Sequence, residues 1–169
     1  MKIFKRKDYF DLNQTIILFG KQISVEVEYC KIKNAELNLS NNVINVYLPH
    51  KYKKQKNLSI IKLAIDKMYE EIARIEIENI MEETRIKLNG LAPENYQIKK
   101  IPNKLAKMTL DKNLVINPEI VKYDKQILRY VILYEFCRLK YKTNCKSLFM
   151  MMKENMQNYE DYNYILNVA

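Results

Sequence analysis

The sequence is poor in histidine and cysteine, the residues that most metal sites and redox motifs need. Of its 169 residues, one is histidine, His50, and three are cysteine, Cys30, Cys137 and Cys145. No two cysteines show the two-residue spacing of a zinc knuckle or a redox motif, so we expect free thiols in a reducing compartment. The single histidine constrains function more than any other feature of the composition.

Long apolar runs are absent as well. No stretch approaches the roughly 18 uninterrupted apolar residues of a membrane span. The start MKIFKRKDYFDLN places charges where a signal peptide has its apolar core. We therefore expect a cytoplasmic protein with no membrane partner. Because 48% of its 169 residues are hydrophobic, the chain can bury the core of one domain.

The chain carries an excess of positive charge. Its formal net charge of +9 suits a nucleic acid or another anionic partner. However, lysine, asparagine, isoleucine and tyrosine are all abundant, as an AT-rich genome favours, and the lysines are spread along the chain. The run KYKKQK at 51–56 could likewise contact phosphates or form a solvated linker. Both interpretations of the charge stay open.

The N-terminal third alternates between apolar and polar residues, which is typical of half-buried strands. The stretches TIILFG and ISVEVEY meet at Gly20 and Lys21 and predict one β-hairpin. AELNLS and VINVYLP flank Asn41 and Asn42 and predict a second hairpin, because asparagine tolerates a positive φ. We expect an antiparallel sheet from these four strands.

The remainder predicts helices around a second β segment. Residues from about 58 to 88 should form a long amphipathic helix that ends at Asn89 and Gly90. Its apolar stripe comprises Ile61, Ile65, Met68, Ile72 and Ile75. YQIKKI and KLAKMTLDKNLVIN predict strands, DKQILRYVILYEFCRLKYK a buried helix, and SLFMMMKENMQNYEDYNYIL a closing helical segment. We expect one α+β domain over 1–169, with a β-hairpin region at 1–56 and a helical core at 57–169.

Four stretches in the second half carry a resemblance to a known family. They are KLAKMT, LVIN at 114–117, YVILYEFCRLKYKTNCKSLF at 130–149 and NYEDY at 158–162. In spacing they resemble RWGSCS, an IxLN strand, YVVxHELAHLxxxNHSxxFW and a tyrosine-containing tail in the YgjP-like metal-dependent hydrolases, minimal zinc metallopeptidases related to the WLM and SprT-like groups. The resemblance implies a zincin-like minimal metallopeptidase fold.

The resemblance also implies where a zinc site would lie. The first metal-binding histidine of the family falls on Tyr134, the second on Arg138 and the third on Asn144, while the catalytic glutamate is kept as Glu135. In the family, two imidazoles four residues apart hold zinc, and the glutamate takes a proton from the metal-bound water. A phenol, a guanidinium and an amide do not replace imidazole. We therefore expect no metal ligand at these positions and no cofactor, although the resembled family uses zinc.

These substitutions lead to a main expectation and its alternatives. The main expectation is a catalytically inactive metallopeptidase homologue, a pseudoenzyme, whose cleft is vestigial or binds a peptide or protein. Arg138 would then pair with Glu135 in the space of the ion, unless both side chains point into solvent. One alternative is an active metal-dependent hydrolase with a site rebuilt from Cys137, Cys145 or His50. Another is a basic nucleic-acid-binding module.

Overall fold

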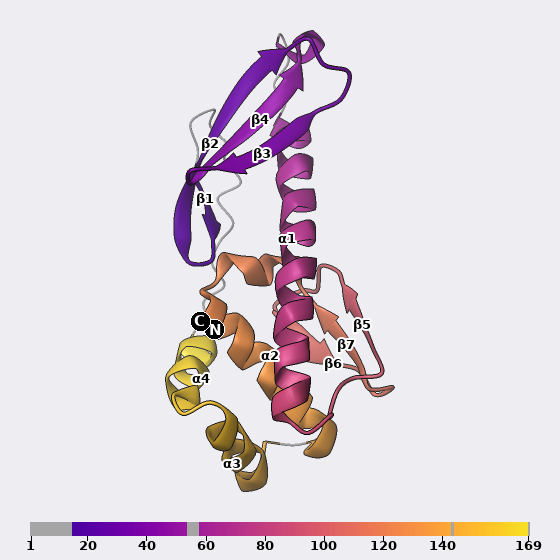
Figure 1. The fold of residues 1–169 in the computed structure, drawn as a ribbon, viewed down its shortest axis with the longest axis vertical. Coiled ribbons are helices and arrows are strands. Elements are labelled where there is room, and N and C mark those ends of the chain that lie inside the picture. Colours follow the sequence, from indigo (N-terminus) through magenta and orange to yellow (C-terminus); the bar gives the residue numbers. More distant parts are fainter. Residues whose placement is uncertain (1–14, 54–57, 143, 169) are drawn as a thin grey trace.

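The computed structural model describes residues 15–53, 58–142 and 144–168. The molecule is elongated, and the 30-residue helix α1 (Leu58–Lys87) runs along its long axis (Figure 1). A four-stranded sheet lies beside the N-terminal half of α1, and a three-stranded sheet and the other helices surround its C-terminal half. In the part of the chain that is described, no helix is both long and apolar enough to cross a membrane.

The first sheet contains both predicted hairpins. Its strands are β1 (Thr15–Leu18), β2 (Lys21–Cys30), β3 (Glu36–Ser40) and β4 (Val43–Pro49), in the order β1-β2-β4-β3. β1 pairs with β2 and β3 with β4 in antiparallel fashion, and Asn41 and Asn42 have the expected positive φ of 48° and 61°. Alternation therefore predicted both hairpins correctly, and the second turn lies where its asparagines predict it. The first turn consists of Phe19 and Gly20, one residue earlier than expected, because Lys21 already pairs with Leu18.

The prediction of a wholly antiparallel sheet is wrong, because β2 and β4 pair in parallel, with Cys30 opposite Pro49. Apolar alternation fixes which face of a strand is buried but says nothing of strand order. Placing β4 in the interior of the sheet leaves Ile44, Val46 and Leu48 at 0% exposure, the deepest burial in this sheet. The burial of β4 favours this mixed order.

Helix α1 forms where the periodicity predicts it, and Asn89 and Gly90 end it with positive φ. The predicted stripe is only partly correct, because Ile75 is 62% exposed. In the second half of the helix the buried side chains are instead Ala73, Ile77 and Ile80. The buried face shifts around the helix because its N-terminal half packs on the first sheet and its C-terminal half on other elements.

The second sheet is built from β5 (Asn95–Ile98), β6 (Ala106–Met108) and β7 (Asn113–Ile116), in the order β5-β7-β6. β7 is central, parallel to β5 and antiparallel to β6, so that β6 is an edge strand. The short helix η2 (Pro118–Lys122) and α2 (Lys125–Lys140) follow. As predicted, α2 is buried over most of its surface, from Ile127 to Cys137.

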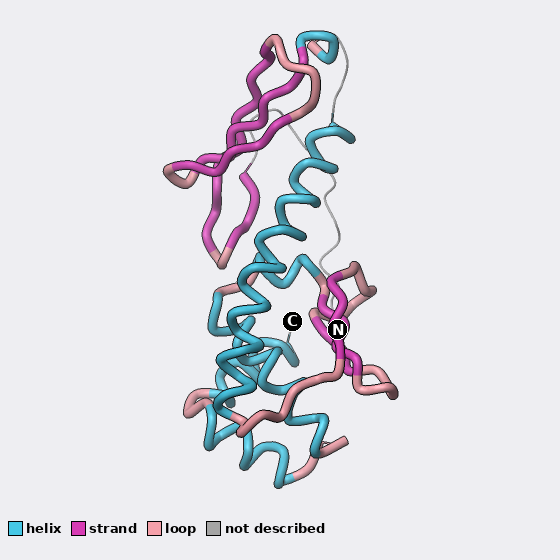
Figure 2. Tube along the Cα trace, turned by 45° about the vertical axis from the view of Figure 1, so that its right-hand side comes forward, coloured by secondary structure: helices cyan, strands magenta, loops and turns pink. Residues whose placement is uncertain are grey.

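The predicted closing helical segment forms two helices. They are α3 (Lys146–Asn155) and α4 (Tyr159–Val168), both next to α2 at the end of the molecule away from the first sheet (Figure 2). Met156 ends α3 in an extended conformation, with φ −151° and ψ 102°. The apolar residues of MMMKENMQNY keep a helical spacing across this break, so the sequence pattern does not reveal it.

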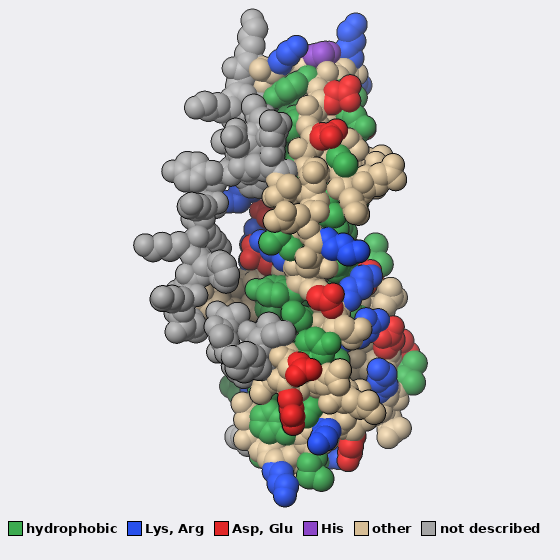
Figure 3. Space-filling view, turned by 90° about the vertical axis from the view of Figure 1, so that its left-hand side faces the viewer, with side chains coloured by type: hydrophobic (Ala, Val, Ile, Leu, Met, Phe, Trp, Pro, Cys, Tyr) green, Lys and Arg blue, Asp and Glu red, His purple; other side chains and the backbone are tan. Residues whose placement is uncertain are grey.

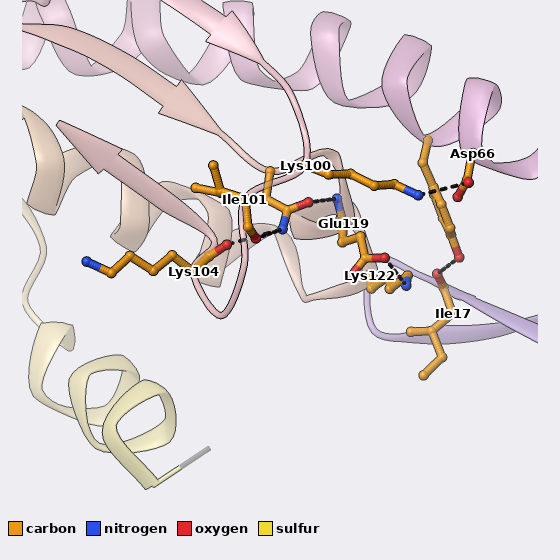
Figure 4. A network of polar contacts seen from close by, with 9 residues as sticks. Ile17, Asp66, Lys100, Ile101, Lys104, Glu119 and Lys122 are labelled. Carbon is orange, nitrogen blue, oxygen red and sulfur yellow. Dashed lines mark hydrogen bonds and ion pairs between the residues drawn. The ribbon is translucent and has the colours of Figure 1, made fainter. Parts of the chain in front are cut away.

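A turn and a tyrosine join the first sheet to the rest of the molecule. In the β1–β2 turn, the backbone N–H groups of Phe19 and Gly20 donate to the carbonyl oxygens of Val121 and Lys122 in η2, at 2.7 and 3.1 Å. Gly20 has φ +76°, which favours glycine. From α1, the Tyr69 hydroxyl donates to the Ile17 carbonyl oxygen at 2.8 Å (Figure 4).

Candidate functional site

Three of the four candidate residues lie on one helix, α2. Glu135 is only 4% exposed, whereas Tyr134 and Arg138 are half-buried. Tyr134 and Arg138 are four residues apart and therefore share a helix face. The guanidinium carbon of Arg138 lies 6.0 Å from the centre of the Tyr134 ring, within the range of a cation–π contact.

The Glu135 carboxylate bridges two elements. Arg138 Nη1 lies 3.4 Å from Glu135 Oε2 and 3.5 Å from Oε1. From the other side, the backbone N–H of Met108 on β6 donates to Oε2 at 2.8 Å. Burial raises the pKa of Glu135, while Arg138, the Met108 N–H and Lys104 act in the opposite direction. The carboxylate thus joins α2 to the edge strand β6.

Asn144 comes to this site from the segment that follows α2. The Tyr134 hydroxyl donates a hydrogen bond to Asn144 Oδ1 at 2.6 Å. The structure therefore brings together all four positions, Tyr134, Glu135, Arg138 and Asn144. We call these four side chains, with the Met108 N–H, the polar network.

Sequence reasoning missed two parts of this site. The first is the Met108 N–H, a backbone group that no residue type signals. The second is Asn117, which is 8% exposed and follows β7. Its amide donates to the carbonyl oxygens of Ile101 and Lys104 at 3.0 and 3.2 Å, and its oxygen accepts from the Glu119 N–H (Figure 4). Asn117 thereby fixes the loop that leads into β6.

The other candidate ligands do not join the four positions. Cys137 is fully buried, and burial raises the pKa of its thiol to about 11. His50 begins the short helix η1 (His50–Tyr52), which follows β4 at the opposite end of the molecule from α3 (Figure 1). Cys145 is half-buried before α3. Among residues 15–53, 58–142 and 144–168, no three His, Cys, Asp or Glu side chains gather in a way that could hold a metal ion.

A comparison with family models decides the relationship. The model described as "YgjP-like, metallopeptidase domain" matches residues 2–169. The chain belongs to this family. This confirms the resemblance seen in the sequence. No curated protein matches the chain.

Two solved structures are similar to part of this YgjP-like domain. The crystal structure of the metallopeptidase zymogen of Pyrococcus abyssi abylysin is 14% identical, with a TM-score of 0.47, and the match covers 55% of this chain and 94% of that one. The metallopeptidase zymogen of Methanocaldococcus jannaschii jannalysin is 24% identical, with a TM-score of 0.45, over 55% of this chain and 97% of that one.

The residues of this YgjP-like domain do not fit a zinc ion at the family's metal position. Zinc binds thiolate, imidazole and carboxylate ligands. The side chains at the three ligand positions are a phenol, a guanidinium and an amide, none of which is a usual zinc ligand. The adjacent Glu135 is of a type that can bind zinc, but its carboxylate already contacts Arg138 and the Met108 N–H.

Two further aromatic side chains, Tyr130 of α2 and Tyr162 of α4, pack beside the polar network. The ring of Tyr130, one helical turn before Tyr134, stacks on it with 6.2 Å between ring centres and also contacts Tyr162 of α4 at 6.1 Å. The Tyr130 hydroxyl donates to Asn163 Oδ1 at 3.0 Å. Burial raises the pKa of Tyr130 to about 12, so it remains a hydrogen-bond donor at neutral pH. These contacts hold α4 against α2 beside the network.

A cavity of about 590 Å³ is not lined by the polar network. It opens between the C-terminal ends of α1 and α2 and one side of α3. Lys87, Lys140, Tyr141 and Met151 are among the residues that line it. None of Tyr134, Glu135, Arg138 and Asn144 does so.

Proposed function

We propose that this chain is a catalytically inactive YgjP-like domain in which the polar network has replaced the metal site. The observation that carries the proposal is the state of Glu135, the one catalytic residue that is kept. Its carboxylate is buried against α2 and β6 and contacts Arg138 Nη1 and the Met108 N–H. A general base needs to face the water that it deprotonates, and these partners occupy the carboxylate instead.

The chemistry of the missing ligands supports the same proposal. In zinc hydrolases the ion lowers the pKa of bound water to about 7, which corresponds to roughly 12 kcal/mol relative to free water. Glu135 alone cannot supply this activation. The positive charge of Arg138 lies beside Glu135 but cannot bind and polarise a water molecule as a Lewis acid does.

The position of β6 favours a structural role for the network. An edge strand can bind a peptide through its unpaired backbone groups. Here the Met108 N–H, which points away from β7, is already bonded to Glu135. We infer that the network closes this part of the strand edge and fixes α2 against the second sheet.

Metal content and hydrolysis test the proposal together. The wild-type chain, purified without added zinc and then dialysed after exposure to zinc, should retain well below one equivalent. It should also leave unfolded protein substrates intact. The matched variant Tyr134→His/Arg138→His/Asn144→His restores three imidazoles at the family's ligand positions, and we expect it to retain close to one equivalent of zinc.

Even if the variant does not fold, the measurement on the wild type tests the proposal by itself. One tightly held zinc ion per wild-type chain, or peptide cleavage that a chelator abolishes, would contradict the proposal. Either result would instead support an active metal-dependent hydrolase with non-standard ligands. The two-histidine variant Tyr134→His/Arg138→His serves as a control for weak zinc binding to surface imidazoles.

A further inference from the structure

Two basic segments that are far apart in the sequence meet at one end of the first sheet. Lys31 and Lys33 follow β2, and His50, Lys51 and Lys53 follow β4. Since β2 and β4 run in parallel and Cys30 lies opposite Pro49, both segments leave the sheet at the same end. We call these five residues the basic tip.

The side chains of the basic tip are all exposed. Segments 31–35 and 50–53 contain no acidic residue. The nearest acidic side chains in the strands are Glu28 and Glu36, which both lie opposite Tyr47 in the register. The four lysines of the tip therefore outnumber the two nearest strand glutamates, which leaves an excess of positive charge. Figure 3 shows lysine or arginine and histidine side chains together at this end of the molecule, with acidic side chains set back from it.

A tyrosine, Tyr52, lies between two residues of the basic tip. Tyr52 stands between Lys51 and Lys53 in the sequence, and the Lys51 ammonium is 5.0 Å from the centre of its ring. Lysines bind the phosphates of nucleic acids, and aromatic rings stack on their bases. A lipid surface offers the same negative charge but no bases, so the tyrosine favours a nucleic acid.

We propose that the basic tip binds the phosphate backbone of a nucleic acid without reading its base sequence. This activity goes beyond the loss of catalysis and does not depend on it, because the polar network lies around the other half of α1. The linear sequence hides the site, since the two lysine pairs are 20 residues apart and only the parallel pairing brings them together.

Fluorescence anisotropy with short labelled single-stranded RNA and duplex DNA tests the proposal. We expect the full chain to bind, and the variant Lys31→Gln/Lys33→Gln/Lys51→Gln/Lys53→Gln to bind at least about tenfold more weakly at low salt. Its salt dependence should also become shallower, by up to about 0.7 to 0.9 in the log–log slope for each phosphate that the tip no longer neutralises.

The control variant Lys99→Gln/Lys112→Gln/Lys146→Gln/Lys153→Gln removes the same charge from exposed positions outside the tip. It should keep an affinity within about threefold of the wild-type value, since only non-specific attraction is reduced. Equal losses in the two variants would overturn the proposal, because the tip would then be no different from other basic surface. So would binding to anionic phospholipid vesicles with no binding to either nucleic acid.

Discussion

At the scale of single residues, Arg138 and Arg129 offer a direct comparison. Both belong to α2, and the side chain of each is 33% exposed. Their carboxylate partners differ, since the side chain of Glu135 is 6% exposed and that of Glu83 is 51% exposed. A buried carboxylate depends on its partners much more than an exposed one, because water cannot replace them.

We predict that Arg138→Ala lowers the free energy of unfolding by about 1 to 3 kcal/mol, because Glu135 keeps its burial but loses its ion pair. Arg129→Ala, which breaks an exposed pair, should cost less than about 0.5 kcal/mol. Urea denaturation of both variants measures the difference. Similar losses in the two variants would show that Glu135 does not rely on Arg138.

The candidate site could be predicted from the sequence only where helix geometry decides it. Tyr134, Glu135 and Arg138 had to be neighbours because they lie on successive turns of one helix. The family's spacing assigned Tyr134 and Asn144 to two ligand positions of one site, but it did not predict the hydrogen bond between them. The link to Met108 depends on which strand edge faces α2, and this follows from the packing of the second sheet and not from any local pattern.

At the scale of elements, α1 shows how far periodicity reaches. The 3.6-residue repeat predicted the helix and the buried side chains of its N-terminal half, Ile61, Ile65 and Met68. The repeat wrongly predicted that Ile75 is buried, because the elements that pack on α1 change along its length. The spacing of apolar residues within one helix does not show which elements pack against it. The parallel pairing of β2 and β4 was missed for the same reason, since strand order is a property of the whole sheet.

The junction between the first sheet and the rest of the molecule depends on Tyr69. This side chain is 5% exposed, and its hydroxyl donates to the Ile17 carbonyl oxygen. We predict that Tyr69→Phe lowers the free energy of unfolding by about 1 kcal/mol, because the carbonyl loses its partner in a partly buried site. Amide exchange in β1 should also become faster, as the strand loses its link to α1.

Tyr96→Phe provides the control for this prediction. Tyr96 also donates to a residue of α1, Glu78, but this contact is exposed, so water can take its place. Urea denaturation should show almost no change in this variant, and exchange in β1 should stay as in the wild type. Equal effects of the two substitutions would mean that the bond to Ile17 contributes nothing specific to the junction.

At the scale of the whole molecule, the polar network and the basic tip lie around different halves of α1. A helix of 30 residues is about 45 Å long. Charges separated by that distance are screened from each other at physiological ionic strength, where the Debye length is about 8 Å. The two proposals therefore concern independent surfaces, and substitutions in one should leave measurements on the other unchanged.

The last prediction concerns metal and the stability of the complete chain. A ligand that binds only the folded state raises the free energy of unfolding by about 2.7 kcal/mol when its concentration is 100 times its dissociation constant. A chain whose native state holds no zinc gains nothing in this way. We predict that thermal unfolding of the wild type has the same midpoint in zinc and in chelator, to within about 1 °C.

The variant Tyr134→His/Arg138→His/Asn144→His should respond differently. Without metal it loses the ion pair of Glu135 and the bond between Tyr134 and Asn144, so its midpoint should fall below that of the wild type. Zinc should then raise the midpoint by several degrees, since about 1 kcal/mol shifts it by roughly 2 to 4 °C in domains of this size. A zinc-dependent midpoint in the wild type would instead mean that the polar network has not taken the place of the ion.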